Sequence, residues 1–283
     1  MIWPPPQEAA TNEGHVPKEL PLREPLVTLL EPVLGVEGCG ILNGISECVP
    51  ESVFSGLRDS RATNLAGVLL VAAGQAPSES GSSLVPGRVD RGWLETFLEE
   101  ASFASAELER TVWGSLLANE LREPGTIYKR TIKFLAGMDL WELESFGEYS
   151  AFAFSFESGW RFMFEGETAR RELLSYGREL DMGHHWVEIG LLGRASMTLD
   201  PRTLRGLRLS YQSLAWSMDS PQAMNAEPPS VICYRKFTAI GQQLASAMKI
   251  KSFKGYAKNV VRAYESMGVA RFLPEDPPAA SKS

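Results

Sequence analysis

Residues 89–146 read VDRGWLETFLEEASFASAELERTVWGSLLANELREPGTIYKRTIKFLAGMDLWELESF, and this stretch predicts most of the fold of the first half. Apolar residues recur along it at spacings of three and four, which is typical of amphipathic helices. Helix caps at Asp90, at Ser105 and at Asp139 with Glu142, and a helix-breaking Pro124-Gly125 pair, divide it into four helices. Because the loops are only a few residues long, we expect antiparallel neighbours in a helical bundle.

Glu120 is the most unusual residue of this stretch. It follows Leu117 by one helical turn and Trp113 by two, so the spacing places a carboxylate on an apolar face. A carboxylate that leaves water without a partner costs several kcal/mol. Glu120 must therefore be paired, or it is a site where the protein holds a tuned acid or base.

Two interpretations of Glu120 stay open at this point. In the structural one, it pairs with Arg130 or Lys133 across the turn, or with free amides at the start of the next helix. In the catalytic one, it acts as an acid or base, but no second carboxylate, histidine or nucleophile stands at a spacing that would complete a site. We expect the structural interpretation, with a structural motif formed by Trp113, Glu120, Pro124, Gly125 and Arg130.

The rest of the chain is organised around this block. Prolines and few large apolar groups predict a disordered arm over residues 1–24. We expect a helical bundle over residues 25–150, interrupted by a mobile Gly/Ser/Pro linker near 75–87. Residues 151–273 form the second predicted domain, and residues 274–283 are a tail.

The second domain mixes helical and strand signals. Residues 151–164 alternate apolar and small residues, as a strand pair or a buried helix end would. Alternation over 207–211, 214–218 and 231–237 predicts three short antiparallel strands, and two helices follow, the first capped by Thr238. The predicted fold class is mainly α, with an N-terminal helical bundle followed by a small α+β winged-helix-like module.

Charge is distributed unevenly along the 283 residues. The net charge is −7, but residues 1–189 carry 15 basic and 29 acidic side chains, whereas residues 190–283 carry 13 and 6. No apolar run approaches a membrane span. An odd number of cysteines without metal-type spacing, and no signal peptide, predict reduced thiols and a cytoplasmic location.

Basic residues of the last third form a candidate binding surface. They are Arg235, Lys236, Lys249, Lys251, Lys254, Lys258 and Arg262. The last four fall at steps of three and four, so they line one face of the final helix. Such a surface contacts nucleic-acid phosphates or an acidic partner, or it is only a solvated helix face.

Cofactor and metal signals are weak. His184-His185 are neighbours, which point to different sides of a helix, whereas metal sites use spacings such as i, i+4 with further ligands. Residues 38–44 superficially match a dinucleotide loop, but Pro25 and Pro32 spoil the strand that must precede it. We therefore expect no cofactor, no metal and no enzyme.

The stretch also resembles a bacterial protein family. The family pattern has an acidic residue with a Trp, a Phe-containing helix, W-x-x-L-L-A-x-E, P-G, and a basic-Thr pair. Here these are Asp90 and Trp93, Phe97, residues 113–120, Pro124-Gly125 and Arg130-Thr131. The chain is similar to domain-of-unknown-function family 2806 over most of residues 50–268. It departs from the pattern in the two residues that separate the acid from the Trp, which puts the local cap in doubt.

The resemblance carries no assigned activity. Related small helical proteins occur in bacterial anti-phage defence settings, so it implies a role of that kind. We expect a non-catalytic protein that acts through protein–protein contacts, as an accessory or sensor in such a system. The alternative is a winged-helix-like nucleic-acid binder, and the third hypothesis is an enzyme with an unrecognised carboxylate site.

The structural interpretation of Glu120 makes a prediction of its own. If Glu120 pairs with Arg130, Glu120→Ala destabilises the fold by leaving Arg130 uncompensated.

Overall fold

The computed structural model describes residues 41, 45, 59–75, 89–177, 181–200, 205–219, 232–267 and 270–275. The predicted arm, nearly all of the predicted linker and most of the predicted tail lie outside these residues. So do His15, Cys39, Cys48 and, apart from Ile41, the glycine-rich stretch 38–44.

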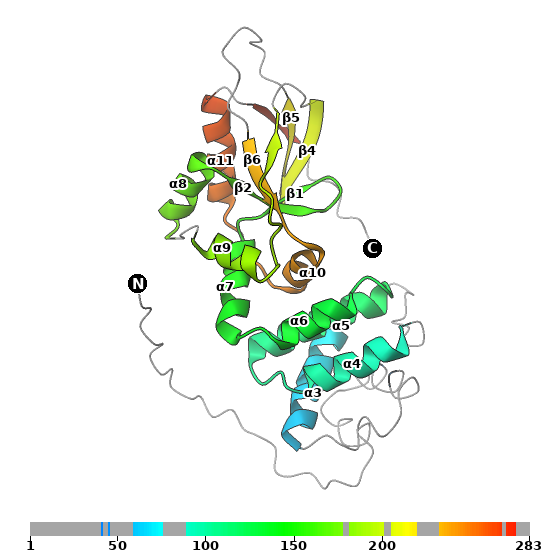
Figure 1. Cartoon of the computed structure of the whole chain (residues 1–283). Coiled ribbons are helices and arrows are strands. Elements are labelled where there is room, and N and C mark those ends of the chain that lie inside the picture. The colour runs from blue at the N-terminus through cyan, green and yellow to red at the C-terminus, as the bar shows by residue number, and fades with distance from the viewer. Residues whose placement is uncertain are drawn as a thin grey trace.

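Helices build the first half of the molecule, in the lower part of Figure 1. They are α3 (Asp59–Ala73), α4 (Arg91–Ala101), α5 (Glu107–Arg122), α6 (Lys129–Ala136) and α7 (Leu140–Ser150). The four helices predicted in residues 89–146 are therefore present. Asp90 caps α4, because its carboxylate accepts a hydrogen bond from the Trp93 amide at 2.8 Å. The second predicted cap is one residue off: α5 follows Ala106, whose amide donates to the Glu109 carboxylate at 2.8 Å.

The centre of this half is the contact between α3 and α5. Gly114 makes the contact possible, because a Cβ at this position would come within 2.5 Å of the Val71 side chain. In the same core, the fully buried Phe97 stacks on Trp93 at 5.1 Å and meets the edge of Trp113 at 5.3 Å. The apolar stripes read from the sequence are therefore the core of this half.

A seven-stranded antiparallel sheet forms the second half. Its strands are β1 (Phe154–Phe156), β2 (Arg161–Glu165), β3 (Met197–Leu199), β4 (Arg205–Tyr211), β5 (Leu214–Asp219), β6 (Ile232–Lys236) and β7 (Arg271–Glu275). The strand order is β3-β6-β2-β1-β4-β5-β7. Residues 151–164 are thus a strand pair, and β7 lies across the predicted start of the tail.

One face of the sheet is aromatic. Phe154, Phe162 and Phe164 are fully buried there. The face is covered by α8 (Glu167–Ser175) and α11 (Lys254–Ser266), which contact each other. Tyr264 of α11 lies 5.2 Å from the Phe164 ring. The period-two alternation of the strands supplies this face.

The other face of the sheet meets the helical half through α10 (Ala239–Ala247). Thr238 caps α10 by accepting from the Gly241 amide at 3.1 Å, as the sequence predicts. The helix contacts α5, α6 and α7, and Figure 1 shows it between the sheet and α6. The short helix α9 (Asp181–Glu188) lies beside α7, where the Phe146 ring meets Trp186 at 5.3 Å.

The predicted fold class is wrong, because a sheet of seven strands makes the chain an α+β protein rather than a mainly α one. The three predicted strands exist, but they do not form the small sheet of a winged-helix-like module. β4 and β5 pair as a hairpin, whereas β6 pairs with β2 and β3. Local alternation locates strands, but it says nothing of partners that are distant in sequence.

Within the described ranges, each helix is too short or too polar to cross a lipid bilayer.

Candidate functional site

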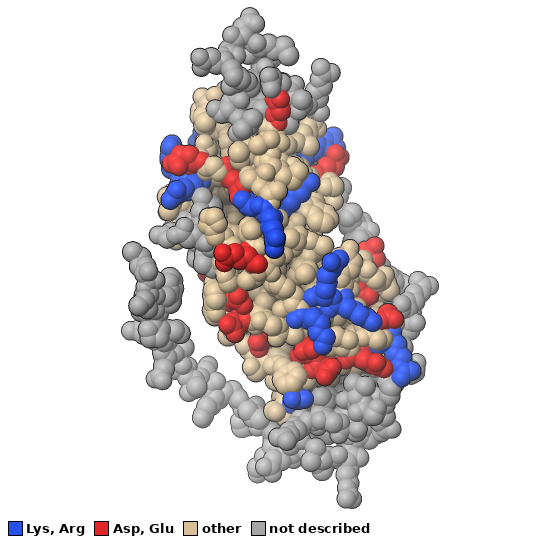
Figure 2. Space-filling model, in the orientation of Figure 1, with Lys and Arg blue, Asp and Glu red and all other residues tan. Residues whose placement is uncertain are grey.

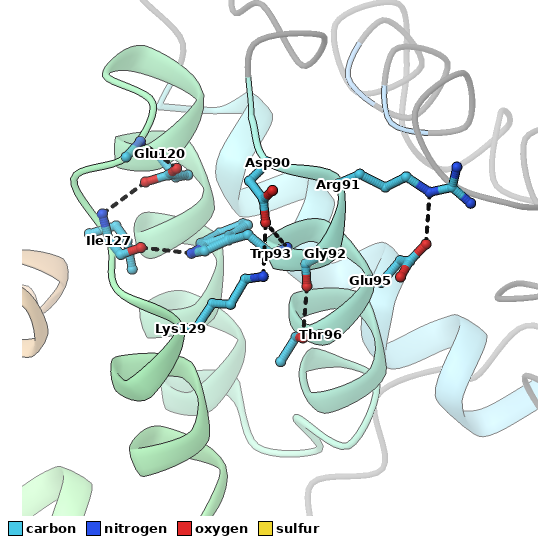
Figure 3. A network of polar contacts seen from close by, with 10 residues as sticks. Asp90, Arg91, Gly92, Trp93, Glu95, Thr96, Glu120, Ile127 and Lys129 are labelled. Carbon is cyan, nitrogen blue, oxygen red and sulfur yellow. Dashed lines mark hydrogen bonds and ion pairs between the residues drawn. The ribbon is translucent and has the colours of Figure 1, made fainter.

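The turn between α5 and α6 is organised around Glu120 (Figure 3). Its side chain is 2% exposed, and both carboxylate oxygens accept backbone hydrogen bonds. The Gly125 amide donates to Oε1 at 2.6 Å and the Ile127 amide to Oε2 at 2.8 Å. Gly125 has φ +89°, which a residue with a side chain rarely adopts, so the Pro124-Gly125 pair allows this turn. Glu120 therefore holds the chain that leads into α6.

Trp93 completes the arrangement from α4. Its indole Nε1–H donates to the Ile127 carbonyl at 2.7 Å, so Ile127 is bound at its amide by Glu120 and at its carbonyl by Trp93. We call the set Asp90, Trp93, Glu120, Gly125 and Ile127 the motif junction. It ties α4, α5 and the start of α6 together through charge-assisted hydrogen bonds to the Asp90 and Glu120 carboxylates and through the bond between the Trp93 indole and the Ile127 carbonyl.

Glu120 thus uses one of the partners that the sequence left open, the backbone amides. It makes no ion pair with Arg130 or Lys133 among the described contacts, and Lys133 pairs with Glu100 instead. The reason expected for the destabilising effect of Glu120→Ala, an uncompensated Arg130, is wrong. The two amides are the groups that would lose their partner. Trp113 lies in the core behind the junction, at 3% exposure.

A surface hollow of about 570 Å³ opens beside the motif junction. Its lining residues are Asp90, Trp93, Glu120, Pro124, Gly125, Ile127, Tyr128, Lys129 and Arg130. Six of these nine carry the family resemblance. Lys129 and Asp90 form an ion pair at 2.9 Å on its edge. The Lys129 ammonium, and then the Trp93 amide, hold the pKa of the Asp90 carboxyl below its usual value.

Tyr128 and Arg130 stand at the rim of this hollow. The Tyr128 side chain is 42% exposed, and the Arg130 guanidinium lies 5.0 Å from its ring centroid. Gln243 of α10 holds the backbone here: its side-chain oxygen accepts from the Tyr128 amide at 3.2 Å and from the Thr131 hydroxyl, and its amide donates to the Thr126 carbonyl. The sequence gives no signal for Gln243, because more than a hundred residues separate it from its partners.

The structure separates the predicted basic surface into parts. Arg235 is partly buried, where it pairs with Glu165 and donates to two backbone carbonyls, and Lys236 lies 5.7 Å from the Phe156 ring. Lys249 and Lys251 are exposed in the connection between α10 and α11. Lys254, Lys258 and Arg262 are exposed along α11. The four residues spaced at three and four thus stay together, whereas Arg235 belongs to an internal contact.

A second group of basic side chains lies over α6, beside a row of acidic ones that follows α4 (Figure 2). Lys129, Arg130 and Lys133 are the exposed basic residues of α6. Residues 1–189 are acidic overall, so the count of charges along the chain hides this basic cluster. Alternation of the two signs makes this surface less attractive to a polyanion than α11.

Of the histidine pair, His185 packs against neighbouring rings and makes a polar contact with Glu142. His185 Nε2 lies 2.9 Å from a Glu142 oxygen, and its ring lies 5.3 Å from the exposed Trp141. His184 is exposed on the neighbouring position of α9. Among the described residues, no three His, Cys, Asp or Glu side chains gather as metal ligands would.

Comparison with known proteins reaches the family level. The family described as "Protein of unknown function (DUF2806)" matches residues 55–261, which is more than half of the chain and includes the whole motif junction. No curated protein and no solved structure matches the chain. The resemblance read from the motif residues is confirmed by this match, and the chain belongs to the DUF2806 family.

Proposed function

We propose that the protein works by binding a protein partner, and that the rim of the hollow beside the motif junction is its contact surface. The observation that carries the proposal is the exposed pair of Tyr128 and Arg130 at the mouth of that hollow. Tyrosine and arginine are among the residues that contribute most to protein interfaces, above all beside a pocket.

The rim is held in place before any partner arrives. The Tyr128 backbone is bound by Gln243, and the turn that precedes it is fixed by Glu120 and Trp93. Arg130 rests over the tyrosine ring. Because these side chains lose less freedom on binding, more of the contact energy is available for affinity.

Binding rather than catalysis is the role that Glu120 supports. Both of its oxygens are occupied by backbone amides, so the carboxylate is engaged in holding a turn. The partner surface that suits the rim carries a carboxylate for Arg130 and an apolar group for the hollow. The complementary charges would set the orientation of the partner.

Affinity capture from the native host, with quantitative mass spectrometry, tests the proposal. Tyr128→Ala with Arg130→Ala should remove the captured partner and leave the melting temperature nearly unchanged. Arg61→Ala with Phe103→Ala is the matched control, because the Arg61 guanidinium lies 3.9 Å from the ring centroid of Phe103, which is 54% exposed. Capture that survives the first pair of changes, or is lost equally with the second, contradicts the proposal.

Nucleic-acid binding by α11 is the second candidate function. Lys254, Lys258 and Arg262 are exposed and occupy one side of the helix, and no ion pair involves them within the part of the chain that the structure describes. Phosphate contacts of this kind release counterions and weaken as salt rises. This candidate rests on the charge of the helix and not on a winged-helix fold.

A gel-shift assay in low salt separates the two candidates. Lys254→Glu with Lys258→Glu should abolish a shift, while Lys129→Glu with Lys133→Glu makes the same change of charge on α6 and should retain it. If wild-type protein gives no shift, the candidate is eliminated. An accessory or sensor role in bacterial anti-phage defence, and a cytoplasmic location, stay predictions that rest on the family resemblance and on the sequence.

A further inference from the structure

A second pocket, of about 280 Å³, lies between the end of α10 and the sheet. Its polar lining consists of Ser150, Ser155, Arg161, Ser210, Gln212 and Ser246, which we call the arginine pocket. None of its lining residues is acidic. It is separate from the hollow at the motif junction, and the two share no lining residue.

Strand register builds the floor of the arginine pocket. Ser155 of β1 pairs with Arg161 of β2 on one side and with Ser210 of β4 on the other. Residues directly opposite one another in a sheet point to the same face, about 5 Å apart. Three strands therefore present two hydroxyls and a guanidinium in one row, on the face opposite the aromatic one.

Arg161 is the only charged member of this lining. Its Nη1 donates to the Ser246 hydroxyl at 2.8 Å and to the Gln242 carbonyl at 3.4 Å. No described carboxylate pairs with it, and burial lowers the pKa of its guanidinium. Glu157, which follows the end of β1, pairs with Arg208 instead. The remaining guanidinium donors are suited to two oxygens of a bound anion.

Ser150 gives an independent indication of a ligand. It ends α7 and is 3% exposed, and its hydroxyl has no hydrogen-bond partner among the described residues. A buried hydroxyl without a partner costs about 1–3 kcal/mol, so one that lacks a protein partner is expected to bind a ligand or an ordered water. Because Ser150 also lines the arginine pocket, a rotation of its side chain toward the pocket would let a polar group of a ligand satisfy the hydroxyl.

The walls of the pocket are fixed in advance. The Gln242 side chain accepts from the Arg161 amide at 3.0 Å and donates to the Gly159 carbonyl at 3.0 Å, which holds α10 against the β1–β2 turn. At the other end, Gln212 has φ +52° and donates to the Lys251 carbonyl at 2.9 Å. A positive φ is usual in a two-residue hairpin turn such as the one between β4 and β5, and the bond to Lys251 ties this turn to the connection between α10 and α11.

We propose that the arginine pocket binds a small molecule through a single oxyanion, a carboxylate or a phosphate, that Arg161 and the surrounding serine hydroxyls recognise. Its volume lies at the small end of ligand sites, which suits a compact organic acid or phosphate ester. The ligand would sit where α7, α10 and the sheet meet. This inference is independent of the partner surface at Tyr128.

Thermal unfolding of the full chain, in inorganic phosphate or acetate against chloride at equal ionic strength, tests the proposal. A saturable rise in melting temperature of roughly 3 °C is expected when the probe exceeds its dissociation constant about tenfold. Arg161→Gln should abolish the rise. Arg208→Gln is the matched control, because it removes an arginine of the same sheet that already pairs with Glu157, and it should retain the rise.

Amide chemical shifts of a ¹⁵N-labelled sample show where the anion binds. The shifts of Ser155 and Ser210 should change with the probe concentration along the same saturation curve as the melting temperature. Ser210→Val, which replaces a hydroxyl of the pocket by an apolar side chain and leaves Arg161 in place, should also weaken binding. This variant keeps the proposal testable where Arg161→Gln does not fold. Stabilisation by phosphate alone or by acetate alone identifies the oxyanion and supports the proposal. If neither probe gives a saturable effect, or Arg161→Gln responds like the wild type, the proposal is overturned.

Discussion

The motif junction holds a buried charged side chain and the arginine pocket a partly buried one, and the two sites treat its polar atoms differently. Glu120 has two backbone amides within 2.8 Å, and the neighbouring indole is bound as well. The guanidinium of Arg161 has a hydroxyl and one long contact to a carbonyl, and Ser150 of the same pocket lining has no partner among the described residues. The junction is complete by itself, whereas the pocket is not.

This difference extends beyond the two sites. Buried polar side-chain atoms without a partner occur in the described residues at Ser150, Trp186 and Tyr256, and none of them belongs to the motif junction. Groups that satisfy one another stabilise the fold, and groups left without partners lower stability until something binds them. The family residues Trp93, Glu120 and Gly125 therefore serve the architecture, while Arg130 stays with the proposed partner surface and the search for small-molecule ligands moves to the sheet.

Loss of Glu120 should have the largest effect. Glu120→Ala leaves the Gly125 and Ile127 amides without acceptors in a buried turn. We expect the free energy of unfolding to fall by about 3 kcal/mol, because each charge-assisted bond contributes about 1.5–3 kcal/mol. Chemical denaturation measures it. Glu123→Ala, an exposed carboxylate in the same turn, is the control, and equal effects of the two changes would show that the junction is not structural.

The spacing of residues 113–120 was enough to place Glu120 on the buried face, because helical periodicity is local. Its partner was not predictable. Arg130, Lys133 and the amides of the next helix all lie within reach along the sequence, and the choice depends on how the Pro124-Gly125 turn directs the chain. The amides are used because the turn brings two of them to the carboxylate.

The sheet shows what local patterns miss. Alternation located β4, β5 and β6, but the position of β6 between β3 and β2 depends on pairings across many residues. The row of Ser155, Arg161 and Ser210 arises from the same register. Each of these residues is unremarkable in its own segment. No sequence signal brings them together, so a site made of them becomes visible only in the fold.

Trp93→Phe should have the second largest effect. The change keeps a ring against Phe97 but removes the hydrogen bond from the indole to the Ile127 carbonyl. We expect a loss of about 1–2 kcal/mol, from the unsatisfied carbonyl and the smaller ring. Trp141→Phe, at an exposed tryptophan, should leave the denaturation midpoint unchanged. If Trp93→Phe is equally silent, the indole hydrogen bond does not matter to the junction.

Tyr256→Phe should act in the opposite direction. The Tyr256 hydroxyl is buried without a partner among the described residues, and burial raises its pKa well above the usual value. Removing a hydroxyl that must leave water without compensation should raise stability by up to about 1 kcal/mol. Tyr211→Phe is the contrasting variant, because the Tyr211 hydroxyl donates to the Ala151 carbonyl at 2.6 Å and accepts from the Phe253 amide at 2.9 Å. Stability should fall there, and the same sign for both changes would contradict the distinction between satisfied and unsatisfied groups.

Asp90 gives the smallest effect, because it belongs to the junction but lies at its exposed edge. Lys129 and the Trp93 amide favour its charged form and lower its pKa. A carboxyl whose pKa is lower in the folded state stabilises the fold above its unfolded value of about 3.9, and this contribution disappears as the pH falls through the folded pKa. Asn at position 90 can still cap α4, so Asp90→Asn removes only the part of the stabilisation that depends on the carboxylate charge.

The melting temperatures of wild type and Asp90→Asn should therefore differ slightly at neutral pH and converge in acid. Added salt should also reduce the difference, because the Asp90–Lys129 pair is open to solvent. A difference that persists unchanged at low pH would mean that Asn fails as a cap and that the carboxylate charge is irrelevant. A large difference in melting temperature that does not change with salt would mean that Asp90 acts as a buried group of the junction. The motif junction would then have no solvent-exposed edge at Asp90.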